Sequence, residues 1–412
     1  MAEPAVAAGP VATAPDAAPP RRCDACGERD LSVCADLGTL PVQCGVHWPE
    51  RAAALASPAG RVTLGYCPGC AYVRNLRFDP QLVVYDTTMD MNLHHSPAFQ
   101  QLTADLTARL AARLPLPGAR VLDLGCAQGE LLRELCRRTG CTGTGWDPAY
   151  TGPVGADPSG ATFHAGLPPR GDALPDYDAF ISRHWLEHLA DPYEFLVELR
   201  ERLAGRPGFG YLEVPDGGYD LGTAGWQVIY PHVSYFDAYS LCRIIARAGW
   251  RVEATGTFFS GTLRWAEVSA NQPEPAVAGA GPAGELPGLA ARDQQLAAIR
   301  TLAARYQAER GRWRQVIDRL AAEGARPVLW GAGSRSVQFL AAADPTRQLA
   351  AVVDVNPRKW GRYLPGGGHR VDPPEQLAQL QPRTVIITNP AYQDEIRKSL
   401  AGLGVTAELL LA

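Results

Sequence analysis

Between Leu102 and about Ala270, short apolar runs alternate with stretches in which apolar residues recur every three or four positions. The strand-like runs are RVLDLG, YDAFIS and GFGYLEVP, and the helix-like stretches are ELLRELCRR, PYEFLVELRERL and SLCRIIARAG. Alternation of this kind predicts a parallel sheet wound with helices. We therefore expect one α/β domain over residues 85–270.

The same alternation returns near the C-terminus. Residues 271–287 are rich in Pro, Gly and Ala without a periodic apolar face, which predicts a linker. A helical stripe then ends at Gly324 and consists of Leu296, Ile299, Leu302, Tyr306, Trp313, Val316 and Leu320. The runs PVLWGAG, LAAVVDV and TVIITN follow as three buried strands, so we predict a second, Rossmann-like α/β domain over residues 288–412.

The N-terminal part of the chain lacks this alternation of strand-like and helix-like stretches. Residues 1–22 contain several prolines and lack the basic and apolar regions of a secretion signal, so we expect a disordered tail. Residues 23–84 are loop-rich and hold two CxxC pairs, CDAC and CPGC, which predicts a small metal-binding module. The expected architecture is thus a zinc module, an α/β domain and a second α/β domain.

Composition narrows the class of function. The chain has 412 residues, 46% of them hydrophobic and 20% charged, with a net charge of -4. This balance gives no electrostatic reason to expect nucleic acid or an anionic membrane as partner, and no apolar run is long enough to span a bilayer. Without a secretion signal, the ten cysteines indicate thiols or metal ligands in a reducing cytoplasm. A small-molecule substrate is the expectation.

Four cysteines have the spacing of a tetrahedral metal site, and they are Cys23, Cys26, Cys67 and Cys70. Four thiolates fill the coordination sphere of zinc and leave no place for water, so the ion would be structural rather than catalytic. Redox-active or merely buried thiols are the alternatives.

Two other functions of a zinc module receive less support. A nucleobase deaminase would need an H-x-E element, but His47 is followed by Trp48 and Pro49. A zinc ribbon that binds nucleic acid would need a strongly basic surface, and this region is only mildly basic. Cys34 and Cys44 lack a CxxC partner, and we expect them to be small core residues.

A glycine-containing loop follows the first strand-like run of the α/β domain. RVLDLGCAQGELLREL carries D-x-G-x-x-x-G as Asp123, Gly125 and Gly129, at the end of a strand and the start of a helix. The spacing differs from the dinucleotide and P-loop patterns. The next strand ends at Asp147, where a carboxylate can accept hydrogen bonds from two ribose hydroxyls.

These elements, with YDAFISRHWLEHLADPYEFL as the third, resemble the motifs of class I S-adenosylmethionine (SAM) methyltransferases. The resemblance implies SAM as cofactor. The residues that it implies for SAM binding are Asp123, Gly125, Cys126, Gln128, Gly129, Asp147, Pro148 and Arg183.

The whole order after residue 22 looks like the deoxysugar C-methyltransferases, which act on nucleotide-linked keto-sugars. The stretch VVDVNPRKWGRYLPGGGHRVDPPEQL is similar to a D-x-N-P-x-K-x-G-x-x-x-P-G pattern of that family. The resemblance implies removal of a proton from the carbon next to a ketone, followed by attack of the enolate on the sulfonium methyl. A positioned base and hydrogen bonds to the enolate oxygen are then required.

The expected base lies in the stretch IYPHVSYF. Where the family has Tyr-x-Glu-His, this chain keeps His232, but it has Pro231 at the glutamate position and Ile229 at the tyrosine position. Tyr230 is one place later, and we expect it to reach the substrate from there. A core histidine hydrogen-bonded among aromatics is the alternative interpretation of His232. The altered glutamate position leaves open a non-sugar substrate, or methyl transfer to oxygen or nitrogen.

A second histidine, His188 in WLEHL, matches the family's other active-site histidine, with helix packing or capping as the alternative. Adjacent Glu187 is expected on the opposite side of the turn. Upstream, Tyr85 and His95 are candidates for substrate binding together with His94, although a solvated interdomain loop is the other interpretation.

The C-terminal domain has a glycine turn of its own. Gly331 and Gly333 precede a helix, and Asp354 follows about twenty residues later, which keeps an NAD-dependent oxidoreductase as an alternative. Ser336 replaces the third glycine. Gly333 and Arg335 are candidates for holding a substrate pyrophosphate at the helix start, and a lid that only buries the pocket is the other interpretation. A binding protein that has lost its chemistry is the remaining alternative.

Overall fold

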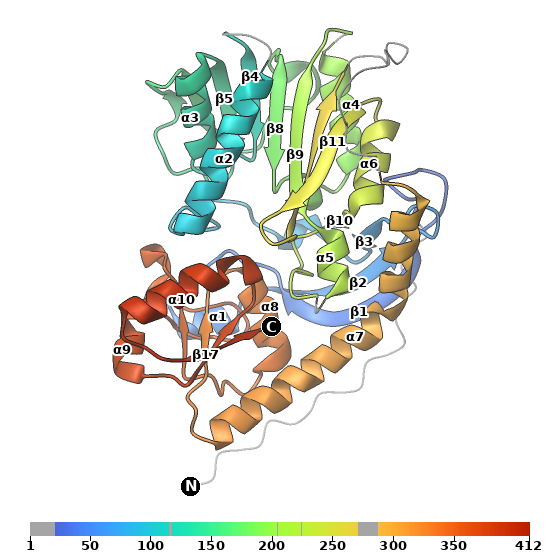
Figure 1. Cartoon of the computed structure of the whole chain (residues 1–412). Helices are drawn as coiled ribbons and strands as arrows, with labels where there is room; N and C mark the ends of the chain where they lie inside the picture. The colour runs from blue at the N-terminus through green and yellow to red at the C-terminus, as the bar shows by residue number, and fades with distance from the viewer. Residues whose placement is uncertain (1–20, 115–117, 204, 224, 271–286) are drawn as a thin grey trace.

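An eight-stranded sheet forms the upper part of the molecule in Figure 1. The computed structural model describes residues 21–412 except 115–117, 204, 224 and 271–286. The strands are β4 (Arg120–Leu124), β5 (Thr142–Asp147), β6 (Gly155–Ala156), β7 (Ala161–Ala165), β8 (Ala179–Arg183), β9 (Phe209–Pro215), β11 (Arg251–Phe258) and β12 (Leu263–Ser269). They lie in the order β11-β12-β9-β8-β4-β5-β7-β6. From β9 to β7 neighbouring strands are parallel, whereas β6 pairs antiparallel with β7, and β12 pairs antiparallel with both β9 and the edge strand β11.

Helices cover both faces of this sheet. On one face, α2 (Pro97–Arg113) and α3 (Glu130–Thr139) bury leucines against the strands, and on the other α4 (Pro192–Arg202) and α6 (Ala238–Arg247) do the same. The predicted strand-like runs and helix-like stretches of the central domain are confirmed as β4, β8, β9, α3, α4 and α6. Strands β11 and β12 were not predicted, because antiparallel strands often alternate polar and apolar residues and lack a continuous apolar run.

The N-terminal module contains a sheet that was not predicted from its loop-rich sequence. Its strands β1 (Ser32–Pro41), β2 (Ala59–Tyr66) and β3 (Val73–Asn75) are antiparallel, and β10 (Ser234–Tyr235) from the central part of the chain completes the sheet beside β3. Short helices α1 (Arg51–Leu55) and η1 (Pro80–Leu82) connect these strands to the rest. The module is therefore joined to the central domain through backbone pairing.

The C-terminal domain has a five-stranded parallel sheet in the order β15-β14-β13-β16-β17. Its strands are β13 (Val328–Trp330), β14 (Ala351–Val353), β15 (Val371–Asp372), β16 (Thr384–Ile387) and β17 (Glu408–Leu411), and its helices are α8 (Ser334–Ala343), α9 (Leu377–Leu380) and α10 (Gln393–Gly402). The three predicted strands are confirmed as β13, β14 and β16. Prolines begin the short 3-10 turns η4 (Pro357–Lys359), η5 (Pro374–Gln376) and η6 (Pro390–Tyr392), where a missing N–H costs nothing.

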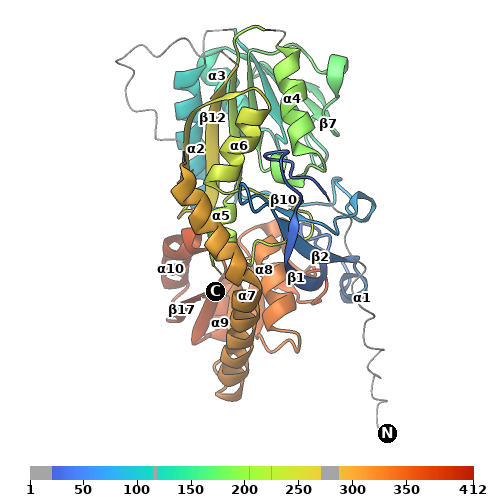
Figure 2. The same cartoon turned by 90° about the vertical axis from the view of Figure 1, so that its right-hand side faces the viewer.

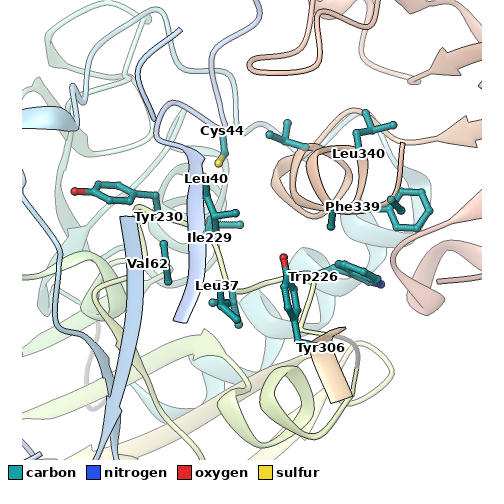
Figure 3. Close-up of a cluster of buried hydrophobic side chains, with 14 of the residues drawn as sticks. Leu37, Leu40, Cys44, Val62, Trp226, Ile229, Tyr230, Tyr306, Phe339 and Leu340 are labelled. Carbon is teal, nitrogen blue, oxygen red and sulfur yellow. The ribbon is translucent and has the colours of Figure 1, made fainter. Parts of the chain in front are cut away.

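The three pieces share one hydrophobic core. The predicted helical stripe forms α7 (Leu289–Ala322), which runs diagonally below the central domain in Figure 1 and along the length of the lower half in Figure 2. In Figure 3, Leu37 and Leu40 of β1, Trp226 and Ile229 of the central part, Tyr306 of α7, and Phe339 and Leu340 of α8 lie together. Cys44 is buried in this core and Cys34 packs against it, as predicted.

Two predicted segments fall mainly outside the described residues. Of the expected tail, residues 1–20 lie outside them, whereas Arg22 forms a β-bridge with Asp30. Of the expected linker, residues 271–286 lie outside them as well. Across the part of the chain that the structure describes, we find no helix whose length and apolar content would suffice to cross a bilayer.

Candidate functional site

The glycine loop after β4 has a backbone that few side chains tolerate. Gly125, Ala127 and Gly129 have φ of 88°, 50° and 81°, all in the left-handed region. A Cβ at Gly129 would lie 2.4 Å from Cε1 of Phe163. The loop therefore turns tightly from β4 into α3 and leaves its backbone open to a ligand.

Asp147, at the end of β5, is fixed against this loop. Its Oδ2 accepts a hydrogen bond from the Ala127 N–H at 2.8 Å, and its Oδ1 accepts one from the Ala149 N–H at 2.7 Å. Gln128 donates through Nε2 to the Ala149 carbonyl at 2.8 Å. The side chain of Asp147 is partly exposed, and Pro148 beside it is too. These residues lie together at one edge of the sheet, where the partly exposed carboxylate of Asp147 can accept further hydrogen bonds.

Two further predicted cofactor residues are buried under the loop. Burial raises the pKa of Asp123 to about 7, with Asp147 acting in the same direction. Cys126 is buried with its sulfur 2.9 Å from where a Cβ at Gly145 would lie. The small residue at Gly145 is thus required by the packing of Cys126.

Arg183 lies at the end of β8, where its guanidinium pairs with the fully buried Glu213 of β9. The Nε atom lies 3.1 and 3.0 Å from the two carboxylate oxygens, and Nη2 lies 3.0 Å from Oε1. Burial acts to raise the pKa of Glu213, but Arg183 and His184 outweigh it and lower the pKa to about 2. The guanidinium is committed to Glu213, so a contact of Arg183 with the cofactor would have to use its backbone.

His184 was not among the predicted site residues. It has φ of 49°, and its imidazole lies between two buried carboxylates: Nε2 is 3.1 Å from Oε1 of Glu213, and Nδ1 is 3.6 Å from Oε1 of Glu187. Burial opposes the charged form, but these two carboxylates raise the pKa of His184 to about 9. His184 is therefore an imidazolium at neutral pH.

His188 lies in the short turn η3 (Leu186–His188). Its Nδ1 is 3.0 Å from the carbonyl oxygen of Pro231 and 3.1 Å from Oη of Tyr85. A carbonyl only accepts hydrogen bonds, so Nδ1 carries the proton and Nε2 carries the lone pair. Burial lowers the pKa of His188, with Glu187 acting in the opposite direction. The structure thus brings the predicted Tyr85 and His188 together.

His232 is buried, with 4% of its surface exposed. Its ring packs edge-on against His188 at 5.0 Å and against Tyr235 at 6.0 Å between centroids. Burial lowers the pKa of His232 well below its usual value, and nearby His188 and His184 act in the same direction. The two predicted histidines therefore lie side by side, and His232 is neutral.

The expected position of Glu187 is wrong. One side-chain atom each of Glu187, His188 and His232 lies within 4.8 Å of the others. The prediction assumed α-helical spacing, but residues 186–188 form a 3-10 turn, and the Val233 N–H donates to the Glu187 carbonyl. Glu187 therefore faces the histidines.

The expectation for Tyr230 is also wrong. Its hydroxyl accepts a hydrogen bond from the Asp79 N–H at 2.9 Å and lies 3.5 Å from the Arg77 carbonyl, both in the N-terminal module. A Cβ at Gly60 would lie 2.2 Å from Cε2 of this ring, so β2 packs directly on it. Figure 3 shows Tyr230 beside Val62, with its hydroxyl directed away from Ile229. Tyr230 anchors the module to the central domain.

The loop before α2 places two histidines differently. His95 is exposed, whereas the ring of His94 packs edge-on against Phe99 with centroids 5.2 Å apart. Of this pair, His94 is thus held against the body of the protein and His95 faces solvent.

The glycine turn of the C-terminal domain is occupied by the protein's own side chains. Oδ2 of Asp354 accepts from the Ala332 N–H at 2.7 Å and from Nζ of Lys359 at 2.9 Å. Nε2 of His47 lies 2.8 Å from the Ala332 carbonyl. A ribose that required Asp354 would compete with these contacts.

Arg335, at the start of α8, connects the C-terminal and central domains. Its Nε donates to Oε1 of Gln227 at 2.6 Å, and its Nη2 lies 3.2 Å from Oδ1 of Asp220 in α5 (Gly217–Gly222). Arg335 and Asp220 line a cavity of about 290 Å³ together with Arg305 of α7. Gly333 caps α8 with φ of -95°, so its conformation is accessible to other residues.

The four cysteines of the N-terminal module converge. The sulfurs of Cys23 and Cys70 lie 3.4 Å apart, and those of Cys26 and Cys67 lie 3.6 Å apart. All four are buried and within 4.8 Å of one another. A tetrahedral zinc with bonds of about 2.3 Å requires sulfur separations of about 3.8 Å, so the four thiolates fit such an ion.

Comparison with known families assigns the two α/β domains. A methyltransferase domain family matches residues 94–255, and a C-methyltransferase C-terminal domain family matches residues 283–406. The sheet order and the loop beside Asp147 agree with the first match. The centre of the chain is therefore a class I, Rossmann-like SAM-dependent methyltransferase domain.

The second match is the more particular one: residues 283–406, which follow this domain, are similar to the C-terminal domain of C-methyltransferases. The ubiquinone biosynthesis O-methyltransferase of Cereibacter sphaeroides is 35% identical over 119 residues, which are 26% of this chain and 46% of that protein. The chain thus spans less than half the length of this relative.

Solved structures are similar over the central part of the chain. The putative methyltransferase bound to the Trm112 activator of Haloferax volcanii is 21% identical with a TM-score of 0.34, covering 43% of this chain and 96% of that one. A SAM-dependent methyltransferase of Aquifex aeolicus is 16% identical with a TM-score of 0.30, covering 42% of this chain and 98% of that one.

Proposed function

We propose that this protein is a SAM-dependent C-methyltransferase that methylates the carbon next to a ketone in a small polar substrate, with a nucleotide-linked keto-sugar as the first candidate. The observation that carries the proposal is the pairing of His188 with His232 and Tyr85 near the carboxyl edge of the sheet that also holds Asp147. The matched C-methyltransferase C-terminal domain supports the same reaction class.

Bound SAM would supply an electrophilic methyl group, and Asp147 with the backbone of residues 125–129 would hold it. The protein's own contribution is to make the substrate carbon nucleophilic. We assign the base to Nε2 of His188, because the carbonyl of Pro231 keeps the proton on Nδ1. This assignment replaces the expectation that His232 is the base, since His232 is only 4% exposed whereas the side chain of His188 is 22% exposed.

Tyr85 is suited to stabilise the enolate. The single N–H of His188 Nδ1 is shared between the Pro231 carbonyl at 3.0 Å and the Tyr85 oxygen at 3.1 Å, which leaves the hydroxyl proton of Tyr85 free for a substrate oxygen. Burial raises the pKa of Tyr85, so the hydroxyl remains protonated across the physiological range. Base and enolate donor would thus be supplied by two side chains in direct contact.

The cavity lined by Arg335 and Arg305 also holds the carboxylates of Asp220 and Glu309, so its charges balance and it gives no net attraction for a pyrophosphate. A small-molecule partner also agrees with the net charge of -4, which gives no attraction to nucleic acid.

Incubation with methyl-labelled SAM and a panel of nucleoside-diphosphate keto-sugars tests this function, with mass spectrometry and NMR locating the methyl group. We expect a new carbon–carbon bond beside the ketone. A methyl on oxygen or nitrogen would contradict C-methylation and make the chain an O- or N-methyltransferase. Binding of SAM without transfer to any acceptor would indicate an inactive binding protein.

His188→Gln tests the assigned base. Loss of a general base lowers turnover by about 10²- to 10⁴-fold. SAM affinity, measured by calorimetry, should stay within a few-fold of the wild type. His95→Gln is the matched control, because His95 is exposed on the neighbouring loop and should leave turnover unchanged.

We also propose a structural zinc ion at the four cysteines. None of the ten cysteines is in a disulfide in the structure, which supports a reducing compartment such as the cytoplasm. Elemental analysis of freshly purified protein should find about one zinc per chain. Cys70→Ser should lose the ion and the folded module, and Cys34→Ser should retain both. Well under one equivalent of zinc in the wild type would contradict the proposal.

A further inference from the structure

Glu187 is a buried carboxylate without a hydrogen bond. It is 2% exposed, and neither of its carboxylate oxygens has a hydrogen-bond partner. Its Oε1 lies 3.6 Å from Nδ1 of His184 and 3.9 Å from Nε2 of His188. Burying an unpaired carboxylate is costly, so a group placed in this way requires compensation by charge.

The charges around Glu187 provide that compensation. From the end of β8, the imidazolium of His184 faces Glu187 on one side and Glu213 on the other. From β9, Glu213 is also paired with Arg183. Two cationic and two anionic side chains therefore balance when His184 is protonated.

The remaining groups of the site carry no fixed charge. From η3 and the segment before β10 come the imidazoles of His188 and His232, and Tyr85 and Tyr235 complete the surroundings. The carboxylate of Glu187 is therefore the nearest anion to a protonated His188. This geometry gives Glu187 a role in any reaction that protonates His188.

We propose that Glu187 is the positioning carboxylate of the active site, stabilising the imidazolium that forms when Nε2 of His188 accepts a substrate proton. The carboxylate that would precede His232 is absent because the chain has Pro231 there. Pro231 instead fixes the tautomer of His188 through its carbonyl, and Glu187 supplies the negative charge from a different turn. This inference rests on the proposed C-methylation.

The proton and electron pair are accounted for in this scheme. The C–H bond beside the ketone breaks, its proton moves to Nε2 of His188, and its electron pair forms the enolate. The enolate carbon then bonds to the methyl group, and the electrons of the broken carbon–sulfur bond remain on sulfur. His188 then returns its proton to solvent, and until it does so the carboxylate of Glu187 stabilises the imidazolium.

Histidine ring NMR of Glu187→Gln tests the proposal without any substrate. In ¹⁵N-labelled protein, long-range ¹H–¹⁵N correlations report the protonation of each imidazole, and His184→Gln and His188→Gln assign the signals. We expect His184 to titrate near pH 9 in the wild type. In Glu187→Gln, the proton affinity of His184 should be at least tenfold lower. Glu267→Gln is the matched control, a buried carboxylate of β12 paired with Arg109 and Arg113.

The kinetic arm uses the keto-sugar panel and keeps the two proposals separate. Glu187→Gln should lower turnover about 10- to 100-fold, leave SAM affinity unchanged and shift the acid limb of the pH profile of turnover. Adding Pro231→Glu to that variant should restore part of the rate. If no substrate is methylated, the proposed function fails, while the NMR result still decides the charge coupling.

Two outcomes would overturn the role of Glu187. Identical histidine titrations in wild type and Glu187→Gln would make the carboxylate a structural group only. A second metal ion per chain, whose removal by a chelator alters the His188 and His232 signals while the cysteine site stays loaded, would replace the positioning role by metal binding.

Discussion

The two α/β domains contain the same local design, a strand that ends in a glycine turn and an acid at the end of the next strand. In the central domain Asp147 accepts from the Ala127 N–H at 2.8 Å, and in the C-terminal domain Asp354 accepts from the Ala332 N–H at 2.7 Å. The difference is Lys359, whose ammonium lies 2.9 Å from the same oxygen of Asp354.

This difference decides which turn serves a ligand. Asp147 is held by backbone amides alone and is partly exposed, so its charge is available to ribose hydroxyls. Asp354 is buried and paired with a cation from its own domain. The pattern of glycines and acid is therefore insufficient to identify a nucleotide site, and the counter-ion must be known. The geometry argues against an NAD-dependent oxidoreductase.

The largest expected effect is that of Lys359→Met. Removing one partner of a buried ion pair leaves an uncompensated charge and costs about 3–5 kcal/mol. Urea denaturation would measure this loss in the free energy of unfolding. Arg358→Met is the control in the adjacent position, because Arg358 is exposed in its pair with Asp90 and should cost no more than about 1 kcal/mol. Equal losses would remove the distinction between the turns.

Gly129→Ala should come next. The left-handed φ and the approach to Phe163 together predict a cost of about 2–4 kcal/mol, seen as a lower melting temperature and weaker SAM binding. Gly333→Ala in the other turn should cost about 1 kcal/mol or less, because its φ is ordinary and nothing lies within 4 Å of its added Cβ. The reverse ranking would contradict the structure of both turns.

Asp147→Asn should weaken SAM binding by about 10- to 100-fold, since a hydrogen bond to a charged acceptor contributes about 1.5–3 kcal/mol. Isothermal calorimetry provides the measurement. Asp354→Asn should leave the SAM affinity within a few-fold of the wild type. Weakening by Asp354→Asn and not by Asp147→Asn would transfer the cofactor to the other domain.

The smallest effect is an opposite pH dependence of stability. Burial raises the pKa of Asp147, so its contribution to stability is lost as pH rises above about 4. For Asp354, burial acts to raise the pKa but Lys359 outweighs it, so its contribution to stability is full above about pH 4 and is lost as pH falls below that value.

The difference in stability between each Asp→Asn variant and the wild type should therefore change with pH in opposite directions for Asp147 and Asp354. As pH rises above about 4, Asp147→Asn should gain stability relative to wild type, and as pH falls below about 4, Asp354→Asn should gain stability relative to wild type, each by about 1 kcal/mol or less. Melting temperatures on both sides of pH 4 are the readout. Slopes of the same sign would show that Lys359 does not govern the C-terminal acid.

Local patterns in the sequence predicted much of the fold. Continuous apolar runs marked parallel strands such as β4 and β8, and the spacing of four cysteines predicted a cluster that the structure assembles. These features are encoded by neighbouring residues. Strands β11 and β1 escaped prediction because an edge or half-exposed strand has no comparable run of apolar residues.

The site was less predictable because its chemistry depends on backbone geometry. Glu187 and His184 face one another only because residues 186–188 form a 3-10 turn after a left-handed residue. The tautomer of His188 depends on the carbonyl of Pro231, and a carbonyl has no signature in the sequence. Tyr230 was misplaced because nothing local specifies that its ring packs on Gly60.

The pairing of β3 with β10 has a consequence for synthesis of the chain. Arg74 and Val73 find their strand partners at Ser234 and Tyr235, about 160 residues later. Leu37 and Leu40 share their core with Phe339, which lies still further along the sequence. Most of the polypeptide must therefore be synthesised before the N-terminal module can complete its sheet and core. An isolated N-terminal fragment would expose its apolar face, which would favour aggregation or chaperone binding.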